Sequence, residues 1–244
     1  MHDLMNQHFD FKQVYNFRDM GGYRAADGRT VRWRRLFRSG EPLRMSEAEA
    51  ARLGEEVSIA TVIDLRSQGE ADHPRGLGPL ITDAVTRHHF PMGDPRTKYD
   101  ARTSGEWDPH YEDLLQERGD TWATIIRLLA EEDAYPAVFH CVTGKDRTGV
   151  LGALILDVLG VDETTILEDF ALSQRGMDRL IADLRAGGKI TDAIQPNPGL
   201  GVPVDAMERM LATLRANHGD AASFLRKHTA DDQTLERLAD LLLE

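Results

Sequence analysis

This sequence of 244 residues is poor in cysteine, with Cys141 as its only one. A single cysteine cannot form an intrachain disulfide, a multi-cysteine zinc site or a CxxC redox pair. The nine histidines show no HExxH or comparable metal-binding spacing. We therefore expect no metal and no other cofactor, and the Cys141 sulfur has to act without a second thiol.

The sequence also lacks long hydrophobic runs. The apolar run from Val150 to Leu156 is ended by Asp157, far short of the roughly 20 residues that cross a bilayer. The first residues, 1–19, are polar and mixed in charge, without the basic, apolar and small-residue order of a signal peptide. These absences predict a protein without a membrane span and favour a cytoplasmic location.

Positive charge is in deficit, with 29 Lys and Arg against 41 Asp and Glu and a net charge of −12. Such a surface repels a polyanion, so we expect no nucleic acid partner. The composition, 41% hydrophobic and 29% charged, provides enough apolar material for a substantial core. No repeat or long linker interrupts the chain, which predicts a single domain over residues 1–244.

Short apolar segments alternate with longer amphipathic ones. The predicted strands cover residues 31–38, 59–65, 85–90 and 137–139, and the predicted helices include 121–131 and 148–159. A capping box formed by Ser46 and Glu49 predicts a helix start there, and Gly54 is placed to end that helix. This alternation predicts an α/β fold with a central, mostly parallel sheet flanked by helices.

The last third of the chain has helical periodicity almost throughout. Asp162 is a suitable N-cap, so we divide the chain at about this point into an α/β core, 1–161, and a helical elaboration, 162–244. Glycines 187–188 and the breaker-rich segment 195–203 interrupt the helices. This connection is either a plain loop or the hinge of a mobile lid.

The segment from His140 to Gly149 reads HCVTGKDRTG and joins a predicted strand to a predicted helix. A loop of this length can curl so that its backbone N–H groups converge on one point, where the helix N-terminus adds partial positive charge. The result is a bowl for a tetrahedral dianion with Cys141 at its floor. The predicted phosphate-binding residues are Val142, Thr143, Gly144, Lys145, Asp146 and Arg147.

The neighbouring side chains each have a physical task in this bowl. The donors that bind a phosphate also stabilise a thiolate at Cys141, and the planar guanidinium of Arg147 can bind two phosphate oxygens at once. Thr148 can offer its hydroxyl to the sulfur as it departs. We expect His140 to order the loop through hydrogen bonds, and Lys145 to lie at the lip and favour multiply anionic substrates.

This loop resembles the CxxxxxR signature of the cysteine-dependent phosphatase superfamily. Its HCxxGKDRTG form is similar to bacterial tyrosine/serine phosphatases with phosphoinositide-phosphatase activity. Three further blocks resemble that family in order and spacing: NFRDMGGY at 16–23, LFRSG at 36–40 and VIDLRS at 62–67. The segment 218–225 resembles its C-terminal helical region, so the resemblance covers nearly the whole chain.

The resemblance implies the cysteine-phosphatase fold and metal-free hydrolysis in two steps. Cys141 attacks phosphorus, a phosphocysteine forms, and water then releases phosphate. The implied substrates are phosphotyrosine and, in addition, phosphoserine, phosphothreonine or phosphoinositides, with phosphate, sulfate and vanadate as active-site ligands. A catalytically inactive module that binds phosphate or phosphoinositides is the alternative that the loop alone leaves open.

The resemblance also implies an aspartate as general acid for the leaving oxygen. In some members it directly follows a Phe-Pro pair, but here Met92 follows Phe90-Pro91. Asp94, two residues later, is one candidate, Asp146 within the loop is the other, and a shared role of the two is a third alternative.

Asp64 and Arg66 lie where a buried strand is predicted to end, at the sheet edge that α/β proteins use for ligands. They either support the bowl or form a structural ion pair.

Overall fold

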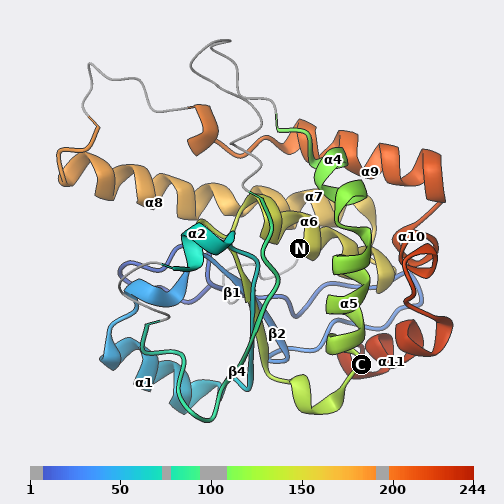
Figure 1. Cartoon of the computed structure of the whole chain (residues 1–244), viewed down its shortest axis with the longest axis horizontal. Coiled ribbons are helices and arrows are strands. Elements are labelled where there is room, and N and C mark those ends of the chain that lie inside the picture. The colour runs from blue at the N-terminus through green and yellow to red at the C-terminus, as the bar shows by residue number, and fades with distance from the viewer. Residues whose placement is uncertain (1–7, 73–77, 94–108, 191–197) are drawn as a thin grey trace.

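The computed structural model describes residues 8–72, 78–93, 109–190 and 198–244 (Figure 1). Within these ranges the strands form a five-stranded sheet in the order β1-β2-β5-β3-β4, antiparallel at β1 and parallel elsewhere. The strands are β1 (Arg18–Asp19), β2 (Leu36–Ser39), β3 (Thr61–Asp64), β4 (Thr86–His89) and β5 (Ala137–His140). The predicted α/β fold with a mostly parallel sheet is confirmed.

Helices follow the strands on both faces of the sheet. The first part of the chain forms α1 (Glu47–Glu56), α2 (Gln68–Ala71), α4 (Tyr111–Glu117), α5 (Gly119–Leu129) and α6 (Asp146–Val158). The last part forms α7 (Glu163–Ala171), α8 (Ser173–Ala186), α9 (Val204–His218), α10 (Ala221–Lys227) and α11 (Asp232–Leu242). Short 3-10 turns are η2 (Pro42–Arg44), η3 (Glu132–Ala134) and η4 (Pro198–Leu200).

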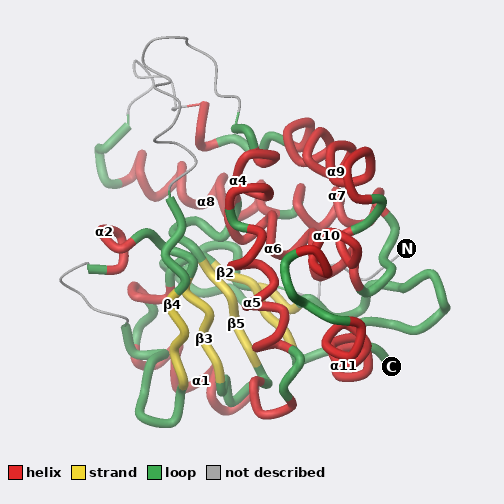
Figure 2. The backbone as a smooth tube through the Cα atoms, turned by 45° about the vertical axis from the view of Figure 1, so that its right-hand side comes forward, coloured by secondary structure: helices red, strands yellow, loops and turns green. Residues whose placement is uncertain are grey.

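The central strands alternate their side chains between two hydrophobic clusters, because successive residues of a strand point to opposite faces. Phe37, Val62 and Val138 pack on one face with Leu53 of α1. The other face contributes to a larger cluster with side chains of α5, α6, α7, α9 and α10. Figure 2 shows α1 behind the sheet and α5 in front of it.

The C-terminal helices complete this larger cluster. Helix α7 contacts α6 and α9, and α10 contacts α5, α6 and α9. Figure 1 shows α9, α10 and α11 on the outer side of α5 and α6. None of the described helices is long and apolar enough to cross a membrane.

Several element boundaries differ from the sequence prediction by one or more residues, including those of β2, α1 and α6. The strand predicted from Val31 begins only at Leu36, because Arg34 has a φ of 62° and residues 33–35 form a turn. Gly54 lies inside α1, which continues to Glu56, although its predicted capping box is present. The helix predicted from Thr148 begins two residues earlier, at Asp146.

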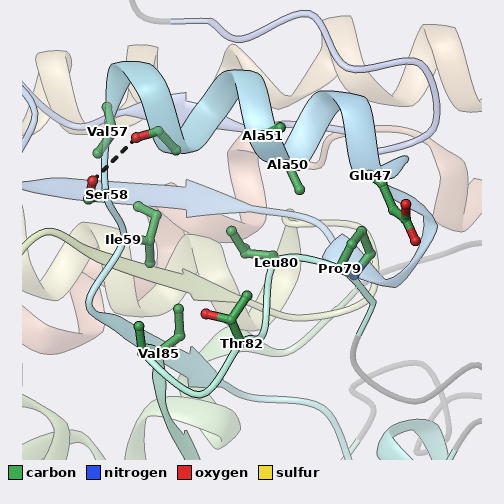
Figure 3. Close-up of a pocket in the computed structure, with 12 residues that line it drawn as sticks. Glu47, Ala50, Ala51, Val57, Ser58, Ile59, Pro79, Leu80, Thr82 and Val85 are labelled. Carbon is green, nitrogen blue, oxygen red and sulfur yellow. Dashed lines mark hydrogen bonds between the residues drawn. The ribbon is translucent and has the colours of Figure 1, made fainter.

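An apolar pocket of about 490 Å³ lies between α1 and the segment before β4 (Figure 3). Ile59 and Val85 in its lining stand just before β3 and β4, so the pocket lies at the amino ends of parallel strands. Among the described residues that line the pocket, Glu47 is the only ionisable one. The loop with Cys141 follows the carboxyl end of β5 and therefore lies at the opposite edge of the sheet.

Candidate active site

The loop from Cys141 to Lys145 joins β5, the central strand, to α6. Parallel pairing places Ser39, Asp64 and His140 in one row at the carboxyl edge of the sheet. Cys141 follows this row directly and is buried. The thiol thus lies at the carboxyl end of β5, between the ends of β2 and β3. Open α/β sheets bind ligands at this end of the strands, where the connections from neighbouring strands leave in opposite directions.

Three consecutive carbonyls of the loop accept hydrogen bonds from the N-terminal segment. The oxygen of Val142 accepts from the backbone N–H of Glu41 at 3.0 Å, and that of Thr143 accepts from Nδ2 of Asn16 at 2.8 Å. The oxygen of Gly144 accepts from the Arg38 guanidinium at 3.2 Å.

The N–H of each peptide unit points away from its C=O, since the unit is planar and trans. The N–H groups of Thr143, Gly144 and Lys145 are therefore turned to the side away from the donors that hold the carbonyls. This is the arrangement that an anion-binding loop requires.

Gly144 makes this close packing feasible. Its φ is +70°, a conformation that L side chains rarely adopt, and a Cβ there would lie 2.5 Å from the backbone of Ser39 and Gly40. The glycine therefore lets the loop lie directly on the end of β2.

Arg147 in the first turn of α6 is buried and held by α2. Glu70 accepts from both terminal nitrogens of the guanidinium, at 2.6 and 3.0 Å, while the carbonyls of Leu65 and Met92 each accept at 3.3 Å. Burial raises the pKa of Glu70, but the hydrogen bonds from Arg147 outweigh it and lower the pKa. These contacts use the terminal nitrogens, so Nε lies on the other edge of the guanidinium.

A buried ion pair lies at the carboxyl end of β3, next to β5. Arg66 binds Asp64 through Nε at 3.0 Å and through a terminal nitrogen at 2.8 Å, and Arg87 adds a third contact at 2.8 Å. Although burial opposes ionisation, His140, Arg66 and Arg87 hold the pKa of Asp64 well below its usual range. The structural ion pair anticipated for Asp64 and Arg66 is present.

His140 is buried, and its Nδ1 lies 3.1 Å from the carbonyl oxygen of Cys141. Burial lowers the pKa of His140 to about 4, and nearby Asp64 offsets this only in part. A neutral imidazole at pH 7 can donate from Nδ1 to this carbonyl, which fits the ordering role expected for His140.

Asp146 is buried at the start of α6 and is held by a tyrosine. Tyr111 of α4 donates its hydroxyl to the Asp146 carboxylate at 2.6 Å, and Nζ of Lys145 lies 3.7 Å from the same oxygen. Burial, Asp146 and Cys141 together raise the pKa of Tyr111 well above its ordinary value. Tyr111 therefore remains a neutral donor to Asp146.

The sequence predicted that Lys145 lies at the lip of the loop, but the structure places it in the interior. Its side chain is buried, and Nζ donates to the carbonyls of Gly199 and Gly201 at 2.6 and 2.7 Å. The reason is tertiary, since the carbonyls that bind this side chain come from residues 199–201, far along the chain from the loop. The ammonium thus ties the loop to the segment before α9.

Two further candidates complete the set. Thr148 is fully buried, and within the described ranges its hydroxyl has no hydrogen-bond partner. Asp94 lies outside the described residues, while Met92, two positions before it, is buried beside Arg147. The described residues include no group of three or more His, Cys, Asp or Glu side chains that could hold a metal ion.

A pocket of about 360 Å³ borders the loop. Val142 and Thr143 form one wall, and Tyr15 together with Leu180 and Asp183 of α8 contributes to the others. The Tyr15 hydroxyl donates to Asp183 at 2.7 Å, and burial together with this contact raises the pKa of Tyr15 to about 12. The pocket is therefore lined by both apolar and charged side chains next to the loop that carries Cys141.

Several residues that hold the loop were not identified by sequence reasoning. Glu70 had a recognisable signal, since Ser67 and Glu70 form a capping box. Asn16 and Arg38 lay within the recognised blocks, but neither was identified as a partner of the loop. Tyr111 had no local signal, because its partner is distant in the sequence.

A cysteine on the loop after a central parallel strand, with an arginine in the first turn of the following helix, defines the class of cysteine-dependent phosphatases. The sequence model of the tyrosine phosphatase family matches residues 9–244. The chain therefore belongs to the tyrosine phosphatase family.

Two relatives with similar sequences agree with this assignment. A putative tyrosine-protein phosphatase of Cupriavidus necator is 29% identical over 236 residues, covering 92% of this chain and 83% of the relative. The triple specificity protein phosphatase PtpB of Mycobacterium tuberculosis is 26% identical over 277 residues, covering 94% and 97%. The crystal structure of P. aeruginosa TpbA aligns with a TM-score of 0.41 and 18% identity, over 82% of this chain and 89% of that one.

Proposed function

We propose that this phosphatase hydrolyses phosphomonoesters through a phosphocysteine on Cys141, without a metal. In the first step the Cys141 sulfur attacks phosphorus, the S–P bond forms, and the bond to the leaving oxygen breaks as an acid protonates that oxygen. In the second step water attacks phosphorus and gives a proton to the carboxylate left by the first step, and the S–P bond breaks to release phosphate and the thiolate. The observation that supports this proposal most directly is that three loop carbonyls accept hydrogen bonds from the N-terminal segment. These bonds leave the N–H groups of the same peptide units directed toward a bound dianion.

Arg147 and Thr148 act on the two ends of the transferred group. Glu70 fixes the Arg147 guanidinium, so that its other edge can follow the phosphoryl oxygens as they flatten in the transition state. The buried hydroxyl of Thr148 stabilises the departing thiolate. The general acid is Asp94 or Asp146.

We propose phosphotyrosine as the main substrate, with phosphoserine, phosphothreonine or phosphoinositides as further substrates. The printed name of the Mycobacterium tuberculosis relative, a triple specificity phosphatase, supports a range wider than phosphotyrosine. The pocket beside Val142 and Thr143 offers about 360 Å³ for the group that carries the phosphate. Rates on phosphotyrosine peptides, phosphoserine peptides and inositol phosphates would rank these classes.

The activity is tested with a chromogenic phosphomonoester in the presence of a metal chelator. We expect turnover that vanadate inhibits, that Cys141→Ser abolishes, and that leaves a phosphorylated Cys141 detectable by mass spectrometry after rapid acid quenching. Turnover that requires added metal, or that survives in Cys141→Ser, would contradict the mechanism. Phosphate binding without any turnover would favour a binding module.

A further inference from the structure

Three charged side chains lie fully buried behind the loop. Asp169 of α7 is 1% exposed, and Arg18 and Arg38, from the first two strands, are each 0% exposed. The Arg18 Nε lies 3.1 Å from one carboxylate oxygen of Asp169, and a terminal nitrogen of Arg38 lies 2.5 Å from the other. We refer to these three residues as the buried triad.

The buried triad carries a net positive charge near neutral pH. Burial raises the pKa of Asp169, but Arg18 and Arg38 outweigh it and lower that pKa to about 2. Burial and Arg18 lower the pKa of Arg38 to about 10, with Asp169 offsetting part of this effect. One carboxylate therefore neutralises only one of two guanidiniums, although such groups are costly to bury.

The two carboxylate oxygens of Asp169 have different partners. One oxygen accepts from Arg18 and, at 3.0 Å, from the Tyr23 hydroxyl. Arg18 also donates to the backbone carbonyl of Asp169 at 2.8 Å, which fixes the C-terminal turn of α7. The second carboxylate oxygen binds Arg38 and thereby sets the direction of that guanidinium.

Arg38 connects the buried triad to the phosphate-binding loop. Its other terminal nitrogen donates to the carbonyl of Gly144 at 3.2 Å. A charged donor on this carbonyl polarises the peptide unit, whose N–H belongs to Lys145 and points to the opposite side. The same contact helps to hold Gly144 at the φ of +70° that the loop adopts.

We propose that Asp169 is a positioning residue for phosphate binding: it holds Arg38 against Gly144 and so keeps the loop amides directed at the bound dianion. The proposal rests on the proposed role of this loop in binding the phosphoryl group. It also assigns a functional task to the C-terminal helices, because α7 delivers the carboxylate.

The test is tungstate binding, measured by isothermal titration calorimetry on the full chain. Asp169→Asn keeps the size of the side chain but makes the protein more positive by one charge. If the triad acted through its charge alone, tungstate would bind this variant more tightly. We expect about tenfold to a hundredfold weaker binding, the range of a lost charge-assisted hydrogen bond, and a similar loss in Arg38→Met. Arg237→Met, which removes an exposed arginine paired with Glu131, serves as the matched charge control and should bind as the original chain does.

Turnover and folding are measured on the same variants. A positioning role predicts a higher KM in folded Asp169→Asn, and partial rescue in Arg38→Lys compared with Arg38→Met, whereas a merely structural role changes only the melting temperature. If Asp169→Asn does not fold, Tyr23→Phe removes one hydrogen bond to Asp169 without changing any charge, and we expect severalfold weaker tungstate binding.

Folded variants that bind tungstate as tightly as the original chain would overturn the proposal while leaving the enzymatic mechanism intact. An original chain that neither binds tungstate nor turns over substrate would instead refute the proposed function itself.

Discussion

Asp94 and Asp146 are the two candidates for the general acid, and single substitutions distinguish them. We expect the Asp→Asn change at the true acid to lower kcat by about a hundredfold or more on an alkyl phosphate, whose leaving oxygen needs a proton. The loss should be smaller on an aryl phosphate with a good leaving group. Steady-state rates on both substrate types provide the measurement.

The other aspartate serves as the control, and its variant should keep kcat within a few-fold of the original on both substrates. Tyr111→Phe adds a second test, because Tyr111 donates its hydroxyl to Asp146. If neither variant distinguished alkyl from aryl phosphates, the acid would have to be a different group.

We expect the buried His140 to make the folding stability of the protein depend on pH. Its pKa is lowered by burial from 6.5 to about 4, so between these pH values the unfolded chain binds the proton and the folded chain does not. Stability from this residue is therefore complete above about pH 6.5 and falls as the pH drops toward 4, by about 3 kcal/mol at most.

Asp19 acts in the opposite direction, because burial raises its pKa to about 6 and the folded chain takes up its proton first. The two effects offset one another between about pH 4 and 6 in the original chain. We expect His140→Asn to reveal this, with a free energy of unfolding that rises more steeply on acidification than in the original chain. Urea denaturation from pH 4 to 7 measures it, and parallel curves for the two proteins would contradict the assignment.

At the scale of single residues, the sequence placed Cys141, Asp146 and Arg147 on one loop because they are close along the chain. It did not identify Glu70 or Asp169 as partners of that loop. Both are distant in sequence from the arginines they bind, and a local pattern carries no information on such pairs.

The role of Gly144 in the loop after β5 can be tested by alanine substitutions at two glycines. Gly144→Ala places a Cβ 2.5 Å from the backbone of Ser39 and Gly40 and forces alanine to a φ of +70°. We expect at least about tenfold lower kcat/KM and a lower melting temperature. Gly54→Ala is the matched control, since a Cβ there meets no atom within 4 Å and the residue lies within α1. It should stabilise the protein by about 0.5–1 kcal/mol with unchanged kinetics, and equal effects of the two changes would contradict the role of Gly144.

Element types were more predictable than element ends. The buried strands β3 and β5 were identified from continuous apolar residues, which depend only on burial. The start of β2 was predicted five residues early, because a local apolar pattern does not reveal the positive φ of Arg34 that turns the chain before Leu36. The N-caps Ser46 and Asp162 were correct, since capping is a contact between residues three apart.

For the whole molecule, we propose that residues 1–244 fold as one unit and that the C-terminal helices are needed for the core. Phe170, Met207, Leu211 and Phe224 are buried in the same cluster as Phe139 of β5. A chain ending at residue 161 would expose this surface and lose Asp169. We expect it to be insoluble or to lack a cooperative thermal transition, as judged by circular dichroism and gel filtration. A soluble, cooperatively folding fragment would show instead that 1–161 is independent.

The sequence by itself determined the α/β layering and the place of the loop that carries Cys141, because hydrophobic periodicity and a contiguous motif are both local properties of the chain. Only the tertiary structure decided which groups orient that loop: Glu70 on Arg147, Tyr111 on Asp146, and Arg38 with Asp169 on Gly144. It also moved Lys145 from the expected lip into a buried contact with the segment before α9. Buried polar groups require partners at hydrogen-bond distance, and the path of the whole chain determines which groups can reach them.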